Sequence, residues 1–232
     1  MSTISESHTQ SVPLLHGVAR PAFASAVFFM LVTGLAYPLA TTGVAQLVMR
    51  SQANGSIVER GGVPIGSLLI GQNFTQPQYF HPRPSATTGP DPVHPDQTIS
   101  QPYNAALSGA SNLGPTSKSL IGQVSARAIA YRKENGLAPD APVPVDAVTA
   151  SASGLDPDIS VANAMLQAVR VAHARGLSID AMRTLIEQNT TRRQFGVLGD
   201  PRIGVLKLNL ALDTAAAAAT TRRQPASARG TP

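Results

Sequence analysis

The sequence contains no cysteine, and its charged residues are scarce. Of the 232 residues only 13% are charged, whereas 43% are hydrophobic. The absence of cysteine excludes disulfide scaffolds, cysteine-based zinc fingers and iron–sulfur clusters. Because charged residues make up about 25% of an average soluble protein, part of this chain is expected to lie outside water.

The positive charge is in excess but scattered. Lys and Arg number 18 against 13 Asp and Glu, which gives a net charge of +5. Nucleic-acid-binding proteins gather such charge in a stripe or patch. Here Arg20, Arg50 and Arg60 flank an apolar stretch, and several other arginines lie near the C-terminus. We therefore expect no nucleic-acid partner.

A long stretch without charged side chains lies between Arg20 and Arg50. A helix needs roughly 20 residues to cross the hydrocarbon of a membrane, and this stretch exceeds that length. A secretory signal has an apolar region of roughly 7–15 residues behind a short basic start. The stretch is longer and follows polar residues, so we predict a transmembrane helix over residues 21–49 and an N-terminal tail over residues 1–20.

Small residues and a proline characterise this predicted span. Pro38 removes one backbone hydrogen bond and Gly34 loosens the turn beside it, so we predict a kinked helix. Ala36, Ala40 and Gly43 follow one helix face. Small residues in this spacing let another membrane helix approach closely. We therefore expect a membrane partner for this face.

The chain after the span is predicted to form a single mixed α/β domain of the α+β class over residues 50–213. Residues 214–232 are rich in Ala, Arg, Pro and Thr and contain no apolar face that could be buried. Chains of this composition do not bury enough apolar surface to fold. We therefore predict a disordered tail there.

Glycines and prolines divide the first half of the domain. Two apolar runs around Gly61-Gly62 predict a hairpin within residues 56–70, and Pro64 places its second strand at a sheet edge. Residues 75–102 contain seven prolines. A connection of this length is either a functional loop pinned to the domain or a disordered excursion, and the sequence leaves both open.

The second half shows helical spacing of apolar residues. One helix is predicted from Gly114-Pro115 to about Asn135. A second runs over residues 161–175 behind the capping residue Ser160, and a third runs from Ser178 to about residue 190. The last apolar run, residues 201–213, alternates like a strand but follows Asp-Pro, which favours a short helix.

Catalytic patterns are incomplete. A nucleophile elbow requires G-x-S-x-G, and residues 109–113 lack the second glycine. There is no Walker A loop for nucleotide phosphates. A membrane-anchored extracytoplasmic serine hydrolase using Ser108 or Ser111 is the alternative function, although no motif positions a histidine and an aspartate for it.

Metal-ligand patterns are equally weak. His81, His94 and Asp96 lie on the Pro-rich segment without the i, i+4 pairing of a helical site, so we expect no metal there. Asp156-Pro157-Asp158 resembles the start of a calcium loop but lacks its glycine and its terminal glutamate. Turn and helix-cap chemistry accounts for it better.

Segments of small residues recur in order along the chain. They are Gly66–Gln72, Arg83–Ser85, Leu107–Pro115 and Asp146–Pro157, joined by Thr33–Pro38, Gln167–Arg175 and Leu208–Asp213. Together with the single span, these segments resemble the C subunits of the bacterial Kdp potassium-transporting P-type ATPases. The resemblance runs from about Arg20 to Asp213, leaving both ends of the chain unmatched.

This resemblance implies a non-catalytic accessory subunit of an ATP-driven potassium uptake complex. Its partners would be a potassium-channel-like membrane subunit and the P-type subunit that hydrolyses ATP. The accessory subunit would assist assembly and raise the ATP affinity of the hydrolysing partner. The resemblance also implies an inner-membrane protein with a cytoplasmic N-terminus and a periplasmic domain. ATP is scarce outside the membrane, which favours a structural and coupling role over direct nucleotide contact.

The family's ABC-like signature corresponds here to Leu107-Ser108-Gly109-Ala110-Ser111, so Ser108, Gly109 and Ser111 are candidate ATP contacts. Hydroxyls and backbone N–H groups before a helix can hold a phosphate, but the same residues can simply cap the helix. The family also implies a glutamine, here Gln167. This side chain is predicted to face away from the apolar stripe of its helix, either towards a ligand or towards solvent. The stripe comprises Val161, Met165, Ala168 and Ala172.

Overall fold

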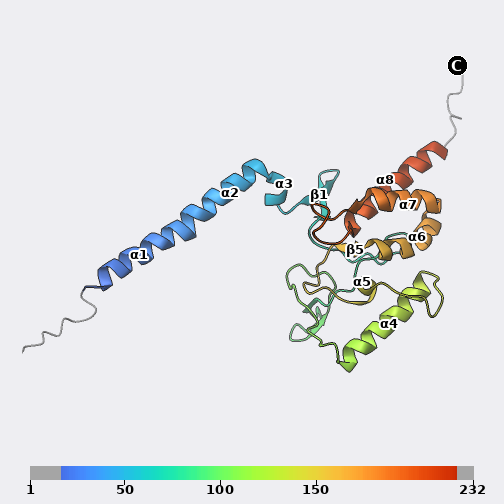
Figure 1. The fold of residues 1–232 in the computed structure, drawn as a ribbon, viewed down its shortest axis with the longest axis horizontal. Coiled ribbons are helices and arrows are strands. Elements are labelled where there is room, and N and C mark those ends of the chain that lie inside the picture. Colours follow the sequence, from blue (N-terminus) through green and yellow to red (C-terminus); the bar gives the residue numbers. More distant parts are fainter. Residues whose placement is uncertain (1–16, 224–232) are drawn as a thin grey trace, which may run out of the picture. The chain divides into compact units, whose positions relative to one another are not determined.

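A computed structural model describes residues 17–223, and the chain divides after Ser56 into two compact units (Figure 1). Residues 1–16 and 224–232, which belong to the two predicted tails, lie outside the described residues. The first unit is helical and the second combines helices with short strands. This confirms the predicted α+β class, with an apolar N-terminal helix followed by a mixed domain.

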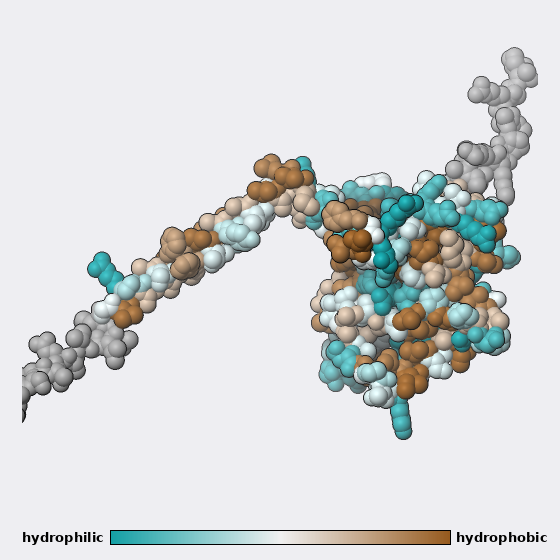
Figure 2. Space-filling view, viewed as in Figure 1, coloured by the Kyte–Doolittle hydropathy of each residue, from teal (hydrophilic) through white to brown (hydrophobic). Residues whose placement is uncertain are grey.

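The first unit is a long apolar helix. It contains α1 (Ala19–Leu31), the π-helical turn η1 (Val32–Ala36) and α2 (Tyr37–Val48), and it is followed by the short α3 (Arg50–Ala53). Residues Ala19–Val48 are long and apolar enough to cross a membrane, and the mean hydropathy reaches 1.8 in an 18-residue stretch of this helix. Figure 2 shows mostly apolar and pale residues along this helix.

Pro38 coincides with an irregularity of the helix, at the place where we predicted a kink. A proline cannot donate to the carbonyl four residues before it. The structure contains a π-helical turn directly before it, in which the N–H of Tyr37 donates to the carbonyl of Val32. The irregularity is therefore a local π-helical widening, and such a turn is one of the recognised causes of a kink.

The second unit contains three small antiparallel sheets and five helices among its described residues. The sheets pair β1 (Ile57–Arg60) with β2 (Val63–Ser67), β3 (Thr88–Pro90) with β4 (Thr98–Ser100), and β7 (Arg202–Gly204) with both β5 (Asp158–Ser160) and β6 (Thr190–Thr191). The helices are α4 (Lys118–Glu134), α5 (Val145–Val148), α6 (Val161–Arg175), α7 (Ile179–Gln188) and α8 (Val205–Arg223). The predicted hairpin around Gly61-Gly62 is confirmed as β1 and β2.

The core lies where α6, α7, α8 and the central strand β7 meet (Figure 1). Ser160 and Ser178 cap α6 and α7 by accepting hydrogen bonds from the backbone of Asn163 and Ala181. Gly176 ends α6 with a φ of 63°, a conformation that favours glycine. The fully buried members of the core include Val171, Met182, Ile186, Ile203, Leu208 and Leu212.

Two predicted boundaries are wrong. Helix α4 begins at Lys118 behind the capping residue Ser117, and not at Pro115. Helix α8 begins at Val205, after strand β7, and continues to Arg223. Residues 214–223 are therefore helical, where we predicted a tail, because alanine has the highest helix propensity and needs no buried face to extend an existing helix.

Candidate functional site

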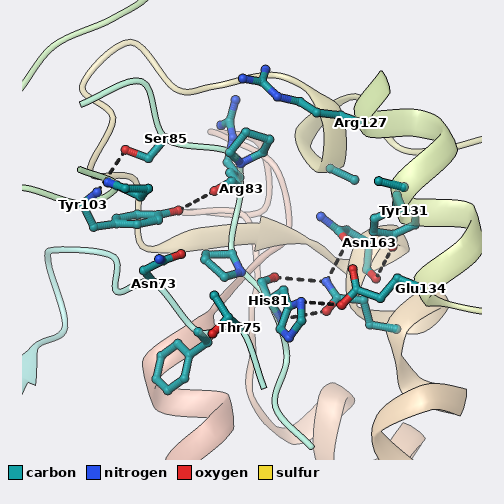
Figure 3. A pocket seen from close by; sticks show the side chains of 17 residues that line it. Asn73, Thr75, His81, Arg83, Ser85, Tyr103, Arg127, Tyr131, Glu134 and Asn163 are labelled. Carbon is teal, nitrogen blue, oxygen red and sulfur yellow. Dashed lines mark hydrogen bonds and ion pairs between the residues drawn. The ribbon is translucent and has the colours of Figure 1, made fainter. Parts of the chain in front are cut away.

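A cavity of about 380 Å³ opens in the domain beside the Pro-rich segment, and α4, α5 and α6 also contribute lining residues (Figure 3). Its lining residues with basic or acidic side chains are His81, Arg83, Arg127 and Glu134. Its other polar lining residues are Asn73, Thr75, Ser85, Tyr103, Tyr131, Asn163 and Gln167, and the prolines are Pro82, Pro84 and Pro102. Prolines have a fixed φ, so this wall is stiff.

Two buried amides hold the Pro-rich segment in place, and we call Gln167 and Asn209 the amide clamp. Asn209 accepts from the N–H of Phe80 at 2.9 Å and donates to its carbonyl at 3.0 Å. Gln167 does the same for His81, at 2.7 and 3.1 Å. Each amide thus satisfies both backbone groups of one residue, as a neighbouring strand would. The segment is therefore pinned to the domain, which resolves the two alternatives left by the sequence.

Arginines of α6 secure the same segment. Arg170 donates to the carbonyls of Pro77 and Tyr79 at 2.6 and 3.0 Å. Arg175 donates to the carbonyl of Gln78 at 2.9 Å and lies over the ring of Tyr79, 4.6 Å from its centroid. Both guanidinium groups are therefore used inside the domain.

The side chains of His81 and Glu134 meet at one end of the cavity. His81 Nδ1 lies 2.7 Å from a carboxylate oxygen of Glu134, and Arg170 Nε lies 3.9 Å from it. The hydrogen bond from His81 lowers the pKa of Glu134, against the effect of partial burial. Burial also lowers the pKa of Arg170. Glu134 is therefore ionised near neutral pH, with His81 bonded to it and the charge of Arg170 nearby.

A hydroxyl network lies beneath this pair. The Tyr131 hydroxyl donates to Asn163 Oδ1 at 2.9 Å. Asp146 accepts from Asn163 Nδ2 at 3.0 Å and from the hydroxyl of Ser160 at 2.9 Å. Burial, followed by the charge of Asp146, raises the pKa of Tyr131 above its usual range. Tyr131 is therefore a neutral hydrogen-bond donor.

Arg83 and Tyr103 form the opposite wall. Arg83 Nη1 lies 2.7 Å from Asp156 Oδ2, and the Tyr103 hydroxyl donates to the carbonyl of Arg83 at 2.7 Å. Burial raises the pKa of Tyr103 as well. Asp156 also accepts from the N–H of Asp158 at 3.0 Å. This Asx turn fits the turn chemistry that the sequence suggested for the Asp-Pro-Asp segment.

The predicted nucleotide-contact segment is tied to a neighbouring loop. The Ser108 hydroxyl and the Gly109 N–H both donate to the carbonyl of Ser153, each at 3.0 Å. Gly154 follows with a φ of +68°, and a Cβ there would lie 2.8 Å from the carbonyl oxygen of Gly109. Ser111 is exposed and does not cap α4, because Ser117 does. Two of the three residues are therefore occupied within the domain.

Gln167 does not face outwards as predicted. Its side chain is 1% exposed and bonds to His81, Asn163 and Arg170. The physical reason is that α6 is covered on two sides, by α7 on one and by the Pro-rich segment on the other, so its buried arc is wider than the apolar stripe. Gln167 lines the cavity and also positions the Pro-rich segment that forms one of its walls.

Residues proposed for the alternative chemistries are not assembled. His81 pairs with Glu134, whereas His94 Nδ1 lies 3.8 Å from Asp91. Within residues 17–223 no cluster of three or more His, Asp or Glu could hold a metal ion. No hydrogen bond in this range joins Ser108 or Ser111 to a histidine, as a serine nucleophile requires.

The sequence alone did not identify Asn209 and Arg127. Asn209 interrupts a run of four leucines, and a single amide within an apolar face was the available signal that it has a buried partner. Nothing in the sequence distinguishes Arg127 from an exposed residue of its helix. Only the packing of α4 beside the Pro-rich segment brings it to the cavity.

Comparison with known proteins covers both units of the chain. Residues 19–214 match the sequence model of the family described as the c chain of the K+-transporting ATPase. The potassium-transporting ATPase KdpC subunit of Rhodopseudomonas palustris strain TIE-1 is 54% identical over 197 residues, which is 85% of this chain and 96% of the relative. Those of Bradyrhizobium diazoefficiens and Methylobacterium nodulans are 52% and 53% identical, over 85% and 84% of this chain and 97% and 95% of the relatives.

An apolar helix joined to a compact domain defines a class of proteins with one candidate membrane anchor and a pinned polar cavity. Within that class, the match over residues 19–214 decides the family. The chain belongs to the KdpC family, the C chains of potassium-transporting ATPases, as the resemblance implied.

Proposed function

We propose that this chain is a non-catalytic accessory subunit of an ATP-driven potassium uptake complex, where it assists assembly and raises the ATP affinity of the hydrolysing P-type subunit. The observation that carries this proposal is that the family match covers the apolar helix and the domain together. The relatives are named as subunits of a potassium-transporting ATPase. Polar side chains of the cavity are engaged in holding the fold, which suits a scaffold.

The proposed partners are a potassium-channel-like membrane subunit and the P-type ATPase subunit. The apolar helix supports a partner in the membrane, because each of its residues from Ala19 to Val48 is exposed or half-buried within this chain. A Cβ added at Gly34 or at Gly43 would meet nothing within 4 Å. This leaves room for the close approach of a neighbouring helix.

We propose that this chain affects ATP affinity through its position beside the hydrolysing subunit. Direct contact between this chain and ATP is the second candidate. The amide of Gln167 and the donors of Ser108 and Gly109 are already used within the domain. The exposed Ser111 is the member of the predicted set that stays available for a nucleotide. This arrangement supports a coupling role.

For localisation we propose the inner membrane, with a cytoplasmic N-terminus and a periplasmic domain. Protease added to intact spheroplasts should then digest the domain, whereas inverted vesicles should protect it. The opposite pattern would place the domain beside ATP and favour direct contact through Ser111.

The function is tested on the detergent-extracted complex from potassium-starved cells. Wild-type chain should be recovered with a large polytopic subunit and a P-type ATPase, and recovery as a free monomer would contradict the accessory role. In reconstituted complex, omission of this chain should raise the KM for ATP. An unchanged KM would refute the proposed effect on ATP affinity while leaving the assembly role intact.

A further inference from the structure

Arg127 brings a charge to the cavity that no carboxylate of the described chain balances. Its Nη1 donates to the carbonyl of Val148 at 3.1 Å, and its Nη2 donates to Gln123 Oε1 at 3.2 Å. Both acceptors are neutral. Among the ion pairs of residues 17–223 none includes Arg127. The guanidinium has five N–H donors, so it can accept a further ligand.

Arg83 lines the same cavity and has an unused donor. Its Nη1 binds Asp156, but its Nε is buried and has no hydrogen-bond partner within residues 17–223. A buried N–H without an acceptor is costly, and such a group calls for a water or a ligand. In Figure 3 the guanidinium groups of Arg83 and Arg127 lie towards the same end of the cavity.

Neighbouring cavities lined by Arg83 have the wrong charge for an anion. One, of about 270 Å³, is also lined by Asp146, Asp156, Asp158 and Asp200. Another, of about 610 Å³, contains Asp156 and no second cation. Of these three, only the 380 Å³ cavity combines Arg83 with a cation that lacks a carboxylate partner.

The single carboxylate among the lining residues of that cavity, Glu134, is already held. His81 and Arg170 lie 2.7 and 3.9 Å from it. The guanidiniums of Arg83 and Arg127 thus face a space whose negative charge is balanced elsewhere. A planar fork of N–H donors matches the oxygens of a carboxylate or a phosphate.

We propose that this cavity binds an oxyanion group, a carboxylate or a phosphate, at Arg127 and Arg83. A volume of about 380 Å³ accommodates such a group together with several waters. The group can be a free small anion or an acidic side chain of a partner subunit, because both present the same oxygens. The first source is independent of the proposed function, whereas the second rests on it.

The first test uses the purified full-length chain in detergent. Equilibrium dialysis measures binding of labelled inorganic phosphate and of succinate, at constant ionic strength. Arg127→Gln should weaken binding about tenfold or more, and Arg127→Lys should recover part of it because it keeps the charge. Arg183→Gln is the control, since Arg183 is exposed on α7 and does not line this cavity. Circular dichroism confirms that each variant is folded.

The second test uses the complex. Saturable binding that depends on Arg127 identifies a free anion as the ligand. A partner carboxylate is identified by two results together. No such binding is found, and the Arg127→Gln chain is lost from the complex whereas the Arg183→Gln chain is retained. Absence of both effects overturns the proposal. Failure of the wild-type chain to join any complex refutes the accessory function, and the dialysis result alone then decides the oxyanion site.

Discussion

The two sides of helix α6 are held in different ways. One side packs apolar residues such as Ala168 and Val171 into the core with α7 and α8. The other side presents Asn163, Gln167 and Arg170 to the Pro-rich segment and to Tyr131. The apolar contact buries apolar surface and depends little on the direction of approach, whereas the polar contact matches individual donors to individual acceptors.

This difference explains how a segment rich in proline adopts one conformation. Prolines lack backbone N–H groups and cannot join the interior of a sheet. The segment instead exposes the backbone of Phe80 and His81 to two amides, while the Phe80 ring enters the core with 0% exposure. Burial of the Phe80 ring holds the Pro-rich segment against the domain, and the amide clamp fixes which of its residues lie opposite Gln167 and Asn209.

The largest effect is expected on the apolar side, from Leu208→Ala. Leu208 is fully buried in the core cluster, and such a truncation costs about 3–5 kcal/mol through lost burial and a residual cavity. Urea unfolding in detergent, followed by circular dichroism, should show one cooperative loss of the whole domain. A loss below about 1 kcal/mol would show that the core does not depend on this contact.

Gln167→Ala should cost about 2–4 kcal/mol, because it leaves both backbone groups of His81 without partners. In contrast to Leu208→Ala, the first consequence should be local. Limited proteolysis should cut residues 77–85 under conditions where α6–α8 stay protected. Gln188→Ala, at an exposed position of α7, is the matched control. Equal protection of the segment in both variants would contradict the clamp.

The caps of α6 and α7 allow a smaller comparison, between a serine that only caps its helix and one that also belongs to the polar network. Ser178 accepts one hydrogen bond, from Ala181 at 3.2 Å, so Ser178→Ala should cost about 0.5–1 kcal/mol. Ser160 caps α6 and also donates to Asp146, so Ser160→Ala should cost about 1–2 kcal/mol. The urea midpoints of the two variants show which substitution destabilises the domain more. The reverse order would show that the Asp146 contact adds nothing.

The smallest effect is a pH dependence on the polar side. The folded state lowers the pKa of Glu134 from its usual 4.5, so its contribution to stability is present above that value and is lost as pH falls below it. Asp158 works in the opposite sense, because burial raises its pKa. The melting temperature of Glu134→Gln should therefore fall less steeply between pH 5 and 3 than that of the wild type or of Glu187→Gln. Parallel curves would contradict this role.

Local signals account for what the sequence could predict. Caps and apolar spacing predicted α6 and α7 behind Ser160 and Ser178, and the glycine pair predicted the first hairpin. The cavity could not be predicted, since it depends on contacts between residues 86 and 129 positions apart. Gln167 shows the limit well, because a polar residue on a helix normally faces water, and only its distant partner makes burial favourable.

Asn209 has a consequence for how the polypeptide is made. Phe80 is synthesised 129 residues before its amide partner, a delay on the order of ten seconds at ordinary translation speeds. During that time the part of the core formed by α8 is missing, so the aromatic ring and its neighbouring prolines cannot pack in their final positions. Any truncated product ending before α8 would keep them exposed, which gives proteases a direct means to remove unfinished chains.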